Sequence, residues 1–291
     1  MVEVLKSLSD AMADTVAQAS EGIVRVEGRK RLAATGIVWS AEGVIVTAHH
    51  VLRRDDDIHI VLANGESHVA TLIGRDPNSD LAVLRVNGAL QPIAKAPADQ
   101  PVRVGNLVLA LGRPGESVQA TLGVVSAIGS GQMDGVIQTD VVMYPGFSGG
   151  PLVDASGFVR GMNTSGFMRG VSVTVSTEKI TSVVDVLLKH GKMKQGFLGI
   201  GAQPVRLREA ISEQVGQETG LMLASVEKDS PAEAANLYEG DIIVKLDGQP
   251  TRNLDELLAL LNGERVGKAV PVTIVRSGQV QEVSVTIGEK Q

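Results

Sequence analysis

Residues 146–153 read Gly-Phe-Ser-Gly-Gly-Pro-Leu-Val, and they say more about the fold than any other part of the chain. Glycines flank Ser148 closely, so its hydroxyl is unshielded and a substrate backbone can approach it. A glycine-rich turn also allows consecutive backbone N–H groups to point at one oxygen atom. Serine is a weak nucleophile near neutral pH unless a base takes its proton. The segment therefore predicts an activated serine that needs a base from elsewhere in the chain.

Candidates for the base and for its orienting acid lie upstream. His49 and His50 are adjacent, and side chains alternate faces along a strand, so only one of them can point into a given cleft. The residues alone do not decide which one. Asp80 opens an apolar run, where a partly buried carboxylate would orient an imidazole and stabilise its charged form. Asp76, in the turn just before, is the rival carboxylate.

The chain order is histidine, aspartate, serine, which is typical of chymotrypsin-like serine proteases. The nucleophile elbow of α/β-hydrolases also boxes a serine between glycines, but its histidine follows the serine, and only His190 does so here. We therefore predict that Ser148 attacks a peptide carbonyl. The oxyanion loop would consist of Gly146, Phe147 and Ser148, with the N–H groups of Gly146 and Ser148 as the donors.

Composition limits the partners and cofactors. The 291 residues are 43% hydrophobic but only 2% aromatic, which predicts an aliphatic core. The net charge of −6 argues against nucleic acid as a partner. The chain has no cysteine and its five histidines show no ligand spacing, so we expect no disulfide, no metal and no cofactor. No segment approaches the roughly 20 apolar residues of a membrane span.

Short runs rich in Val and Ile, separated by turn residues, predict a mostly β protein with barrel or sandwich architecture. Helical periodicity is confined to the first 20 residues and to residues 177–189 in this part of the chain. Residues 96–101 contain two prolines and are the expected hinge between two halves of the β region. Strands are expected at residues 22–26, 36–39, 44–47, 58–62, 70–73, 81–86, 107–111, 121–127, 136–139, 151–153, 158–162 and 171–175.

A second domain follows the polar, glycine-flanked segment 189–196. Its pattern is α+β: Ser230 and Pro231 open one short helix, and Asn253 caps another at residues 254–261. Its strands are expected at residues 197–201, 221–226, 241–246, 270–275 and 281–287. The expected domains are an N-terminal amphipathic helix for oligomerisation (1–20), the β region as a chymotrypsin-like protease domain (21–176), a helix and linker (177–195) and the second domain (196–288).

With these segments in place, the chain resembles the HtrA (Deg) family of serine proteases from about residue 8 to residue 288. The resemblance implies a trypsin-like double β-barrel. It also implies His50 rather than His49, because the family's histidine directly precedes a valine, here Val51. The motifs that carry it lie at residues 74–76, 80–84, 110–114, 123–127, 138–140 and 161–164.

The resemblance also implies where a substrate would bind. Asn163, Thr164 and Ser165 would run beside the substrate backbone. They would line the S1 pocket together with the loop of residues 142–145, in which Val142 is the candidate contact.

The last hundred residues resemble a PDZ domain of the bacterial protease type. Backbone N–H groups of the predicted carboxylate-binding loop would take the C-terminus of a peptide, which adds as a strand beside it. The nearby helix would supply an apolar pocket through Leu257 and either Leu260 or Leu261. The candidate residues of the loop are Phe197, Leu198, Gly199 and Ile200.

Two features depart from the family pattern. Phe147 stands where the family usually has asparagine, so the hydrogen bonds of that side chain are absent. The long N-terminal regulatory loop of the family is missing, since barely ten residues separate Val26 from Gly36. A homotrimer or higher homo-oligomer built through the N-terminal helices remains the expected assembly.

The function that the resemblance implies is an ATP-independent serine endopeptidase of protein quality control and the stress response. It would degrade unfolded or misfolded proteins, with a preference for small aliphatic P1 residues, while the PDZ domain binds peptide C-termini. Two alternatives stay open. The first is a non-catalytic chaperone or sensor of the same fold. The second is a peptide-binding scaffold in which the β region is structural.

The first residues place acids between their apolar positions, unlike the basic and then apolar segments of a signal peptide. The sequence as written therefore predicts a cytoplasmic protein. The alternative is the periplasm or cell envelope, if an upstream leader was removed.

Overall fold

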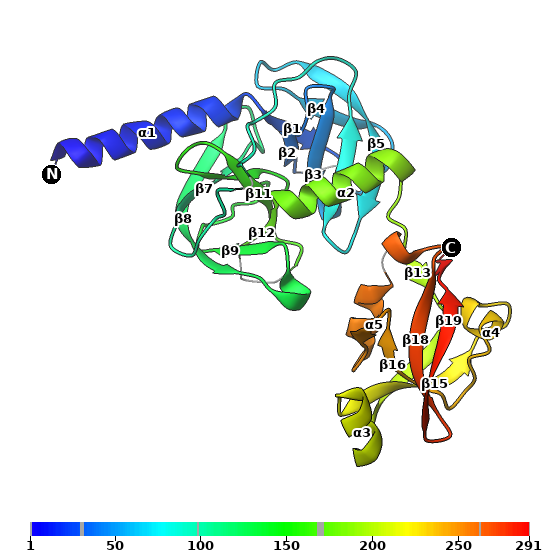
Figure 1. The fold of residues 1–291 in the computed structure, drawn as a ribbon. Helices are drawn as coiled ribbons and strands as arrows, with labels where there is room; N and C mark the ends of the chain where they lie inside the picture. Colours follow the sequence, from blue (N-terminus) through cyan, green and yellow to red (C-terminus); the bar gives the residue numbers. More distant parts are fainter. Residues whose placement is uncertain (1, 30–31, 98, 168–171, 262, 291) are drawn as a thin grey trace. The chain divides into compact units, whose positions relative to one another are not determined.

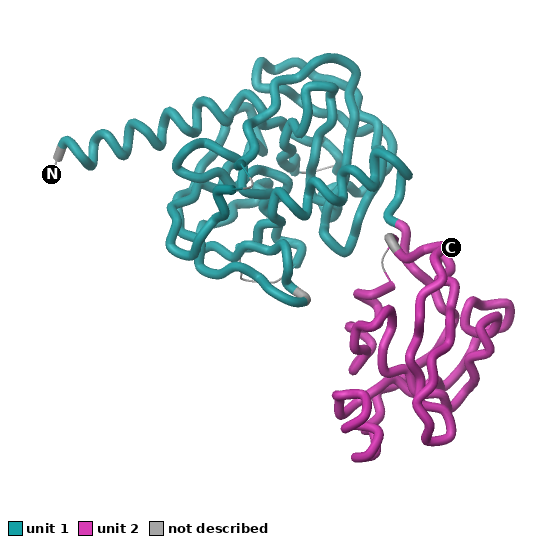
Figure 2. The backbone as a smooth tube through the Cα atoms, in the orientation of Figure 1, with its two compact units in different colours: residues 1–193 teal, residues 194–291 magenta. Residues whose placement is uncertain are grey.

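The computed structural model describes residues 2–29, 32–97, 99–167, 172–261 and 263–290. The chain forms two compact units, residues 1–193 and 194–291 (Figure 2). Each unit has its own hydrophobic core, which is aliphatic as the composition predicts. Among the described residues, no helix combines the length and the hydrophobicity needed to cross a bilayer.

The first unit contains two closed antiparallel barrels of six strands each, which confirms the predicted double barrel (Figure 1). The first barrel consists of β1 (Ile23–Glu27), β2 (Ala34–Val38), β3 (Val44–Ala48), β4 (Ile58–Val61), β5 (Ser67–Asp76) and β6 (Leu81–Arg85), in the order β1-β2-β3-β6-β5-β4. The second consists of β7 (Leu107–Gly112), β8 (Gln119–Ile128), β9 (Val136–Thr139), β10 (Pro151–Asp154), β11 (Val159–Thr164) and β12 (Ser172–Ser176), in the order β10-β11-β12-β9-β8-β7. The predicted hinge lies in the connection from β6 to β7, with Ala98 outside the described residues. Val171, with which the last predicted strand begins, also lies outside them.

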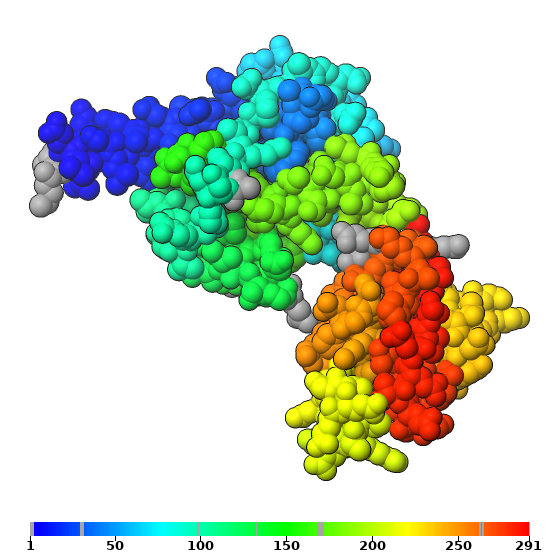
Figure 3. Space-filling model, in the orientation of Figure 1, coloured from blue at the N-terminus to red at the C-terminus, as the bar shows by residue number. Residues whose placement is uncertain are grey.

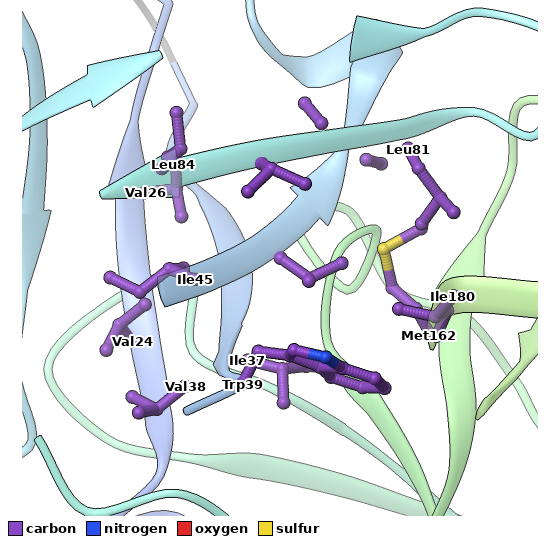
Figure 4. Close-up of a cluster of buried hydrophobic side chains, with 14 of the residues drawn as sticks. Val24, Val26, Ile37, Val38, Trp39, Ile45, Leu81, Leu84, Met162 and Ile180 are labelled. Atoms are coloured by element: carbon purple, nitrogen blue, oxygen red, sulfur yellow. The ribbon is translucent and has the colours of Figure 1, made fainter. Parts of the chain in front are cut away.

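One apolar cluster joins the two barrels. Every residue of β3 is buried, and β3 contacts β11 of the other barrel. Figure 4 shows Met162 of β11 and Ile180 beside side chains of the first barrel such as Leu81. Ile180 belongs to helix α2 (Thr177–His190), which begins at the Ser176 cap and ends at Gly191 in the left-handed conformation. Packing against both barrels therefore fixes the seam between them.

The N-terminal helix α1 (Val2–Ser20) is amphipathic, and its buried residues Thr15 and Ala19 lie in its later turns. Met12 and Val16 pack against the core of the first unit, whereas Val4 and Leu5 are 71% and 63% exposed. In Figure 3 nothing covers the first turns of this helix on the face in view. An apolar surface thus remains on α1.

The main sheet of the second unit has the strand order β14-β15-β16-β18-β19, and β17 pairs with β16. Strands β13 and β20 form a separate pair. Strand β14 lies at one edge of this sheet. Helix α3 was not predicted from the sequence: it is short, buries only Val215, and begins at Arg208 without a side-chain cap. The elements are β13 (Gly196–Phe197), β14 (Ile200–Arg206), α3 (Glu209–Val215), β15 (Thr219–Val226), α4 (Pro231–Ala234), β16 (Ile242–Leu246), β17 (Gln249–Pro250), α5 (Leu254–Leu260), β18 (Ala269–Arg276), β19 (Gln279–Thr286) and β20 (Gly288–Glu289).

Two neighbouring leucines of α2 test the packing of the seam. Leu187 is fully buried, whereas Leu188 is 38% exposed. We expect Leu187→Ala to destabilise the first unit by about 2–5 kcal/mol, because it leaves a cavity between α2 and the barrels. Leu188→Ala should cost less than about 1 kcal/mol. Urea unfolding followed by the fluorescence of Trp39, the single tryptophan, reports this unit selectively. Equal effects of the two substitutions would show that α2 does not pack as described.

Candidate functional site

The predicted catalytic residues meet at the seam between the barrels. His50 lies in a 3₁₀ turn (His49–Val51) directly after β3, and Asp80 directly precedes β6, the neighbour of β3 in the first barrel. Ser148 lies in the loop before β10 of the second barrel. The strand order thus brings together groups that are 30 and 68 residues apart in the chain.

Asp80 holds His50 by two hydrogen bonds. The Nδ1 atom of His50 lies 2.7 Å from Oδ2 of Asp80, and the backbone N–H of His50 donates to Oδ1 at 2.9 Å. The imidazole remains 32% exposed while the carboxylate is 7% exposed. A bond at Nδ1 leaves Nε2 as the free nitrogen of the ring. The carboxylate therefore fixes the orientation of a base that can still be reached from the cleft.

Asp80 is adapted to stay ionised. Burial by itself raises the pKa of this carboxyl, but hydrogen bonds from His50 and from the Thr164 hydroxyl outweigh burial and hold the pKa below the ordinary aspartate value. Asp80 also has a φ of +52°, a left-handed conformation that aspartate tolerates better than most residues. Gly166 lies directly over the pair, since a Cβ atom there would come within 2.6 Å of Oδ2 of Asp80.

The rival residues have other partners. Asp76 accepts hydrogen bonds from the Ser79 hydroxyl and the Asn78 N–H, so it stabilises its own turn. The ring of His49 lies 3.5 Å from the Arg75 guanidinium, outside the Asp80 pair. The two histidines do not lie on a strand, as the sequence suggested, but in a 3₁₀ turn, where adjacent side chains also diverge.

Ser148 is 8% exposed, and its hydroxyl lies 3.1 Å from the hydroxyl of Ser165. The N–H of Ser165 also approaches the Ser148 oxygen, at 3.4 Å. Among the hydrogen bonds of the described residues, none joins Ser148 to His50. The hydroxyl of the nucleophile therefore bonds to Ser165, the residue directly after β11, and not to the imidazole.

The oxyanion loop has an ordered backbone. Gly146 has a φ of +94°, and the Phe147 N–H donates to the carbonyl of Tyr144 at 3.0 Å. Thr35, which the sequence did not indicate, donates its hydroxyl to the Gly146 carbonyl at 2.7 Å. Within the described chain, no acceptor takes the N–H of Gly146 or of Ser148. These two donors remain available to an incoming oxygen.

The Phe147 side chain replaces hydrogen bonds with packing. Its ring is fully buried in the apolar cluster of the second barrel and makes an edge contact with Tyr144, with centroids 5.8 Å apart. Gly112 provides the space, because a Cβ atom there would lie 2.5 Å from the ring. The phenylalanine that departs from the family pattern thus has a matched cavity.

The residues predicted to contact substrate differ in how far their side chains are exposed. Ser165 and Val142 are exposed, and Val142 has 55% of its surface exposed. The side chains of Asn163 and Thr164 are fully buried, so only their backbone could run beside a substrate, and that part of the expectation stays a prediction. Asn163 bonds to the Pro151 carbonyl and the Thr174 hydroxyl, and Thr164 bonds to Asp80. Both stabilise the site from within.

In the second unit the predicted loop links β13 to the edge strand β14. Among the described residues no acceptor takes the N–H of Leu198 or Gly199, and Gly199 has a φ of +74°. Phe197 and Ile200 are half-buried, whereas Leu198 is buried. Leu257, predicted to line the pocket, lies in the core at 1% exposure, as does Leu261 at 6%, and Leu260 is partly buried. The exposed leucines of α5 are Leu254 and Leu258, at 44% and 48%.

Comparison with known families agrees with this division of the chain. Residues 34–162 match the trypsin-like peptidase domain and residues 196–287 match the PDZ domain. A probable periplasmic serine endoprotease of Chlamydia trachomatis, described as DegP-like, is 33% identical over 274 residues. A protein of Marinomonas described in the same way is 35% identical over 271 residues. The alignments cover 90% of this chain but 55% and 58% of those proteins, so the chain spans somewhat more than half their length.

These relatives are named periplasmic, as is one from Brucella suis. This finding contradicts the expectation of a cytoplasmic protein, which is therefore wrong. That expectation rested on the first residues of the chain, whereas neither the barrels nor the site carries information about the compartment.

Solved structures with the same architecture extend over nearly the entire chain. A serine endoprotease from Yersinia pestis is 29% identical and aligns with a TM-score of 0.80, covering 96% of this chain and 98% of that one. The HtrA-type protease AlgW with a tripeptide is 30% identical, with a TM-score of 0.77 and coverage of 96% and 97%. The chain belongs to the HtrA family of serine proteases, with a trypsin-like peptidase domain followed by one PDZ domain.

Proposed function

We propose that the protein is an ATP-independent serine endopeptidase that cleaves unfolded or misfolded proteins through an acyl-enzyme on Ser148. Two observations carry the proposal: the 2.7 Å contact between His50 and Asp80, and the N–H groups of Gly146 and Ser148, which have no acceptor among the described residues. A base with a fixed orientation, a nucleophile and an oxyanion site are the parts that acyl transfer needs.

In the first step, the Ser148 hydroxyl turns from Ser165 toward His50 and loses its proton to Nε2. The oxygen forms a bond to the substrate carbonyl carbon, and the N–H groups of Gly146 and Ser148 stabilise the oxyanion. His50 then gives the same proton to the leaving amine as the C–N bond breaks. Water, deprotonated by His50, hydrolyses the ester and restores the serine.

Asp80 supports both half-reactions without exchanging a proton. Its ionised form stabilises the imidazolium that appears twice in the cycle. Thr164 contributes by stabilising the ionised carboxylate through its hydroxyl. Asn163 contributes through its backbone, which pairs with the N–H of Gly149 and the carbonyl of Gly150 behind the nucleophile.

We propose that an extended substrate lies beside residues 163–166, and that only chains without stable structure can adopt this conformation. Val142 and Ser165 are exposed at the positions proposed to contact the substrate. We also propose that the enzyme prefers small aliphatic residues at P1.

The PDZ domain is proposed to bind peptide C-termini. Its support is the loop before the edge strand β14, where the N–H groups of Leu198 and Gly199 are available within the described residues. A carboxylate at those donors and a strand added to β14 would follow the usual mode of peptide addition to a sheet edge. The AlgW structures contain a tripeptide or a decapeptide.

The exposed apolar residues of α1, among them Val4 and Leu5, favour a homotrimer or higher homo-oligomer formed through this helix. The periplasmic relatives favour the cell envelope as the compartment. The non-catalytic alternative is not favoured, because the groups needed for acyl transfer lie together and the relatives are named endoproteases.

Replacing Ser148 tests the catalytic assignment. We expect Ser148→Ala to abolish casein cleavage while the thermal unfolding midpoint stays within a few degrees, because among the described residues the hydroxyl bonds only to Ser165. The matched variant is Ser165→Ala, which removes the other hydroxyl and should retain cleavage. The release of fluorescence from labelled casein over hours measures the activity of both variants. Cleavage that survives in Ser148→Ala and is lost in Ser165→Ala would show that Ser148 is not the nucleophile.

Replacing Asp80 by the isosteric Asn tests its role. We expect kcat to fall by roughly 10⁴, because Asn no longer stabilises the imidazolium. The lowered pKa of Asp80 stabilises the fold above the pKa of the unfolded chain, and this contribution is lost as the pH falls through the still lower folded value.

The parent protein should therefore unfold at a higher temperature than Asp80→Asn at pH 7. This difference in unfolding midpoint should shrink below about pH 4. Calorimetry across this range measures it, with Asp76→Asn as the control, whose kcat loss should be at least about tenfold smaller. An advantage that grows in acid would contradict the ionised state assigned to Asp80.

A carboxylate-dependent peptide site can be measured in the Ser148→Ala protein, which does not cut its ligand. An apolar decapeptide with a free C-terminus should bind about 10- to 100-fold more tightly than its C-terminal amide, because charged hydrogen bonds to the loop are lost. Leu258→Asp on α5 should weaken binding, whereas Leu188→Asp on α2 should not. Fluorescence anisotropy with equal affinities for acid and amide would rule out this site.

A further inference from the structure

Thr35 of β2 forms hydrogen bonds to the second barrel with both its hydroxyl and its backbone N–H. It is fully buried, and its hydroxyl donates to the Gly146 carbonyl at 2.7 Å. Its backbone N–H donates to the carbonyl of Ser148 at 3.2 Å. One residue of the first barrel thus holds two carbonyls of the oxyanion loop, which are two residues apart.

The direction of the hydroxyl is determined by its second partner. The backbone N–H of Arg113 donates to Oγ1 of Thr35 at 2.8 Å. An N–H can only donate, so the oxygen is the acceptor there, and its single proton is left for the Gly146 carbonyl. A threonine or serine at position 35 satisfies both neighbours, whereas a residue without a hydroxyl satisfies neither.

The peptide unit between Gly146 and Phe147 is held at both ends. Its carbonyl accepts from Thr35, and its N–H donates to the Tyr144 carbonyl at 3.0 Å. Glycine offers little steric resistance to rotation, so these two bonds restrain the backbone at Gly146, where φ is +94°. With both carbonyls turned to Thr35, the N–H groups of Gly146 and Ser148 are left without an acceptor in the described chain.

We propose that Thr35 is a positioning residue of the active site: its hydroxyl sets the Gly146 carbonyl and thereby keeps the N–H donors of the oxyanion hole in place. It acts through the loop and touches no reacting atom. The proposal rests on the function proposed above, because the donors matter only if an oxyanion forms at Ser148.

The test compares Thr35→Val, which keeps the branched shape without the hydroxyl, with Thr35→Ser, which keeps the hydroxyl. On an internally quenched peptide, we expect Thr35→Val to lower kcat by about 10- to 100-fold, with KM within about twofold, because one full oxyanion donor is worth 10²–10³. Thr35→Ser should keep kcat within about threefold of the parent protein. The Phe147 amide should exchange its hydrogen faster in Thr35→Val.

Thr47→Val is the matched control. It removes an equally buried hydroxyl that donates at 2.7 Å to a backbone carbonyl, that of Thr35, without bonding to the oxyanion loop. It should lower the unfolding midpoint as Thr35→Val does, with a much smaller change in kcat. An equal loss of kcat in Thr47→Val, or in Thr35→Ser, would assign Thr35 to barrel packing and overturn the proposal.

Different results would refute the proposed function and the positioning role of Thr35. Absence of Ser148-dependent cleavage by the parent protein would refute the proposed function. Unchanged kcat and unchanged amide exchange in Thr35→Val, with an active parent protein, would refute the positioning role alone. Amide exchange does not depend on turnover, so it decides the role of the hydroxyl in either case.

Discussion

Hydrogen bonds that cross from one barrel to the other are the constraint on which the site depends. His50 and Asp80 belong to the first barrel and Ser148 to the second, so only cross-barrel contacts can fix their spacing. Thr164 of β11 bonds to Asp80, and Thr35 of β2 bonds to the loop around Ser148. Each barrel thus supplies one buried threonine that fixes catalytic groups of the other, and the shared apolar cluster keeps both barrels at this separation.

The oxyanion loop shows how packing can take the place of a polar side chain. Phe147 fills the space that Gly112 leaves open, and its ring lies against Tyr144 from the same loop. Apolar burial of this kind has no direction, so it anchors the loop without orienting its peptides. Orientation then falls to the hydrogen bonds of Gly146 and Phe147, which explains why a buried hydroxyl is found beside an otherwise apolar anchor.

Much of the fold could be predicted from the sequence, because Val- and Ile-rich runs between turn residues specify short strands, and both barrels follow from them. The triad could be named from spacing and from the resemblance. Thr35 and Gly112 could not, because their roles depend on contacts between segments far apart in the chain. Thr164 bonds to Asp80 and Asn163 is buried beside it, because which way a strand residue faces is set by the barrel and not by the motif. The exposed side of α5 was missed because the packing of the second unit decides which face of this helix is buried, and it buries Leu257 while leaving Leu258 exposed.

The central claim is that Ser148 is the reactive serine, activated by His50 and Asp80 across the seam. The most direct measurement is mass spectrometry of the folded protein after treatment with a fluorophosphonate, which phosphonylates a serine only where a base and an oxyanion site act together. We expect one adduct, on the peptide that contains Ser148, and none after unfolding in urea. An adduct on another residue, or none on the folded protein, would contradict the account.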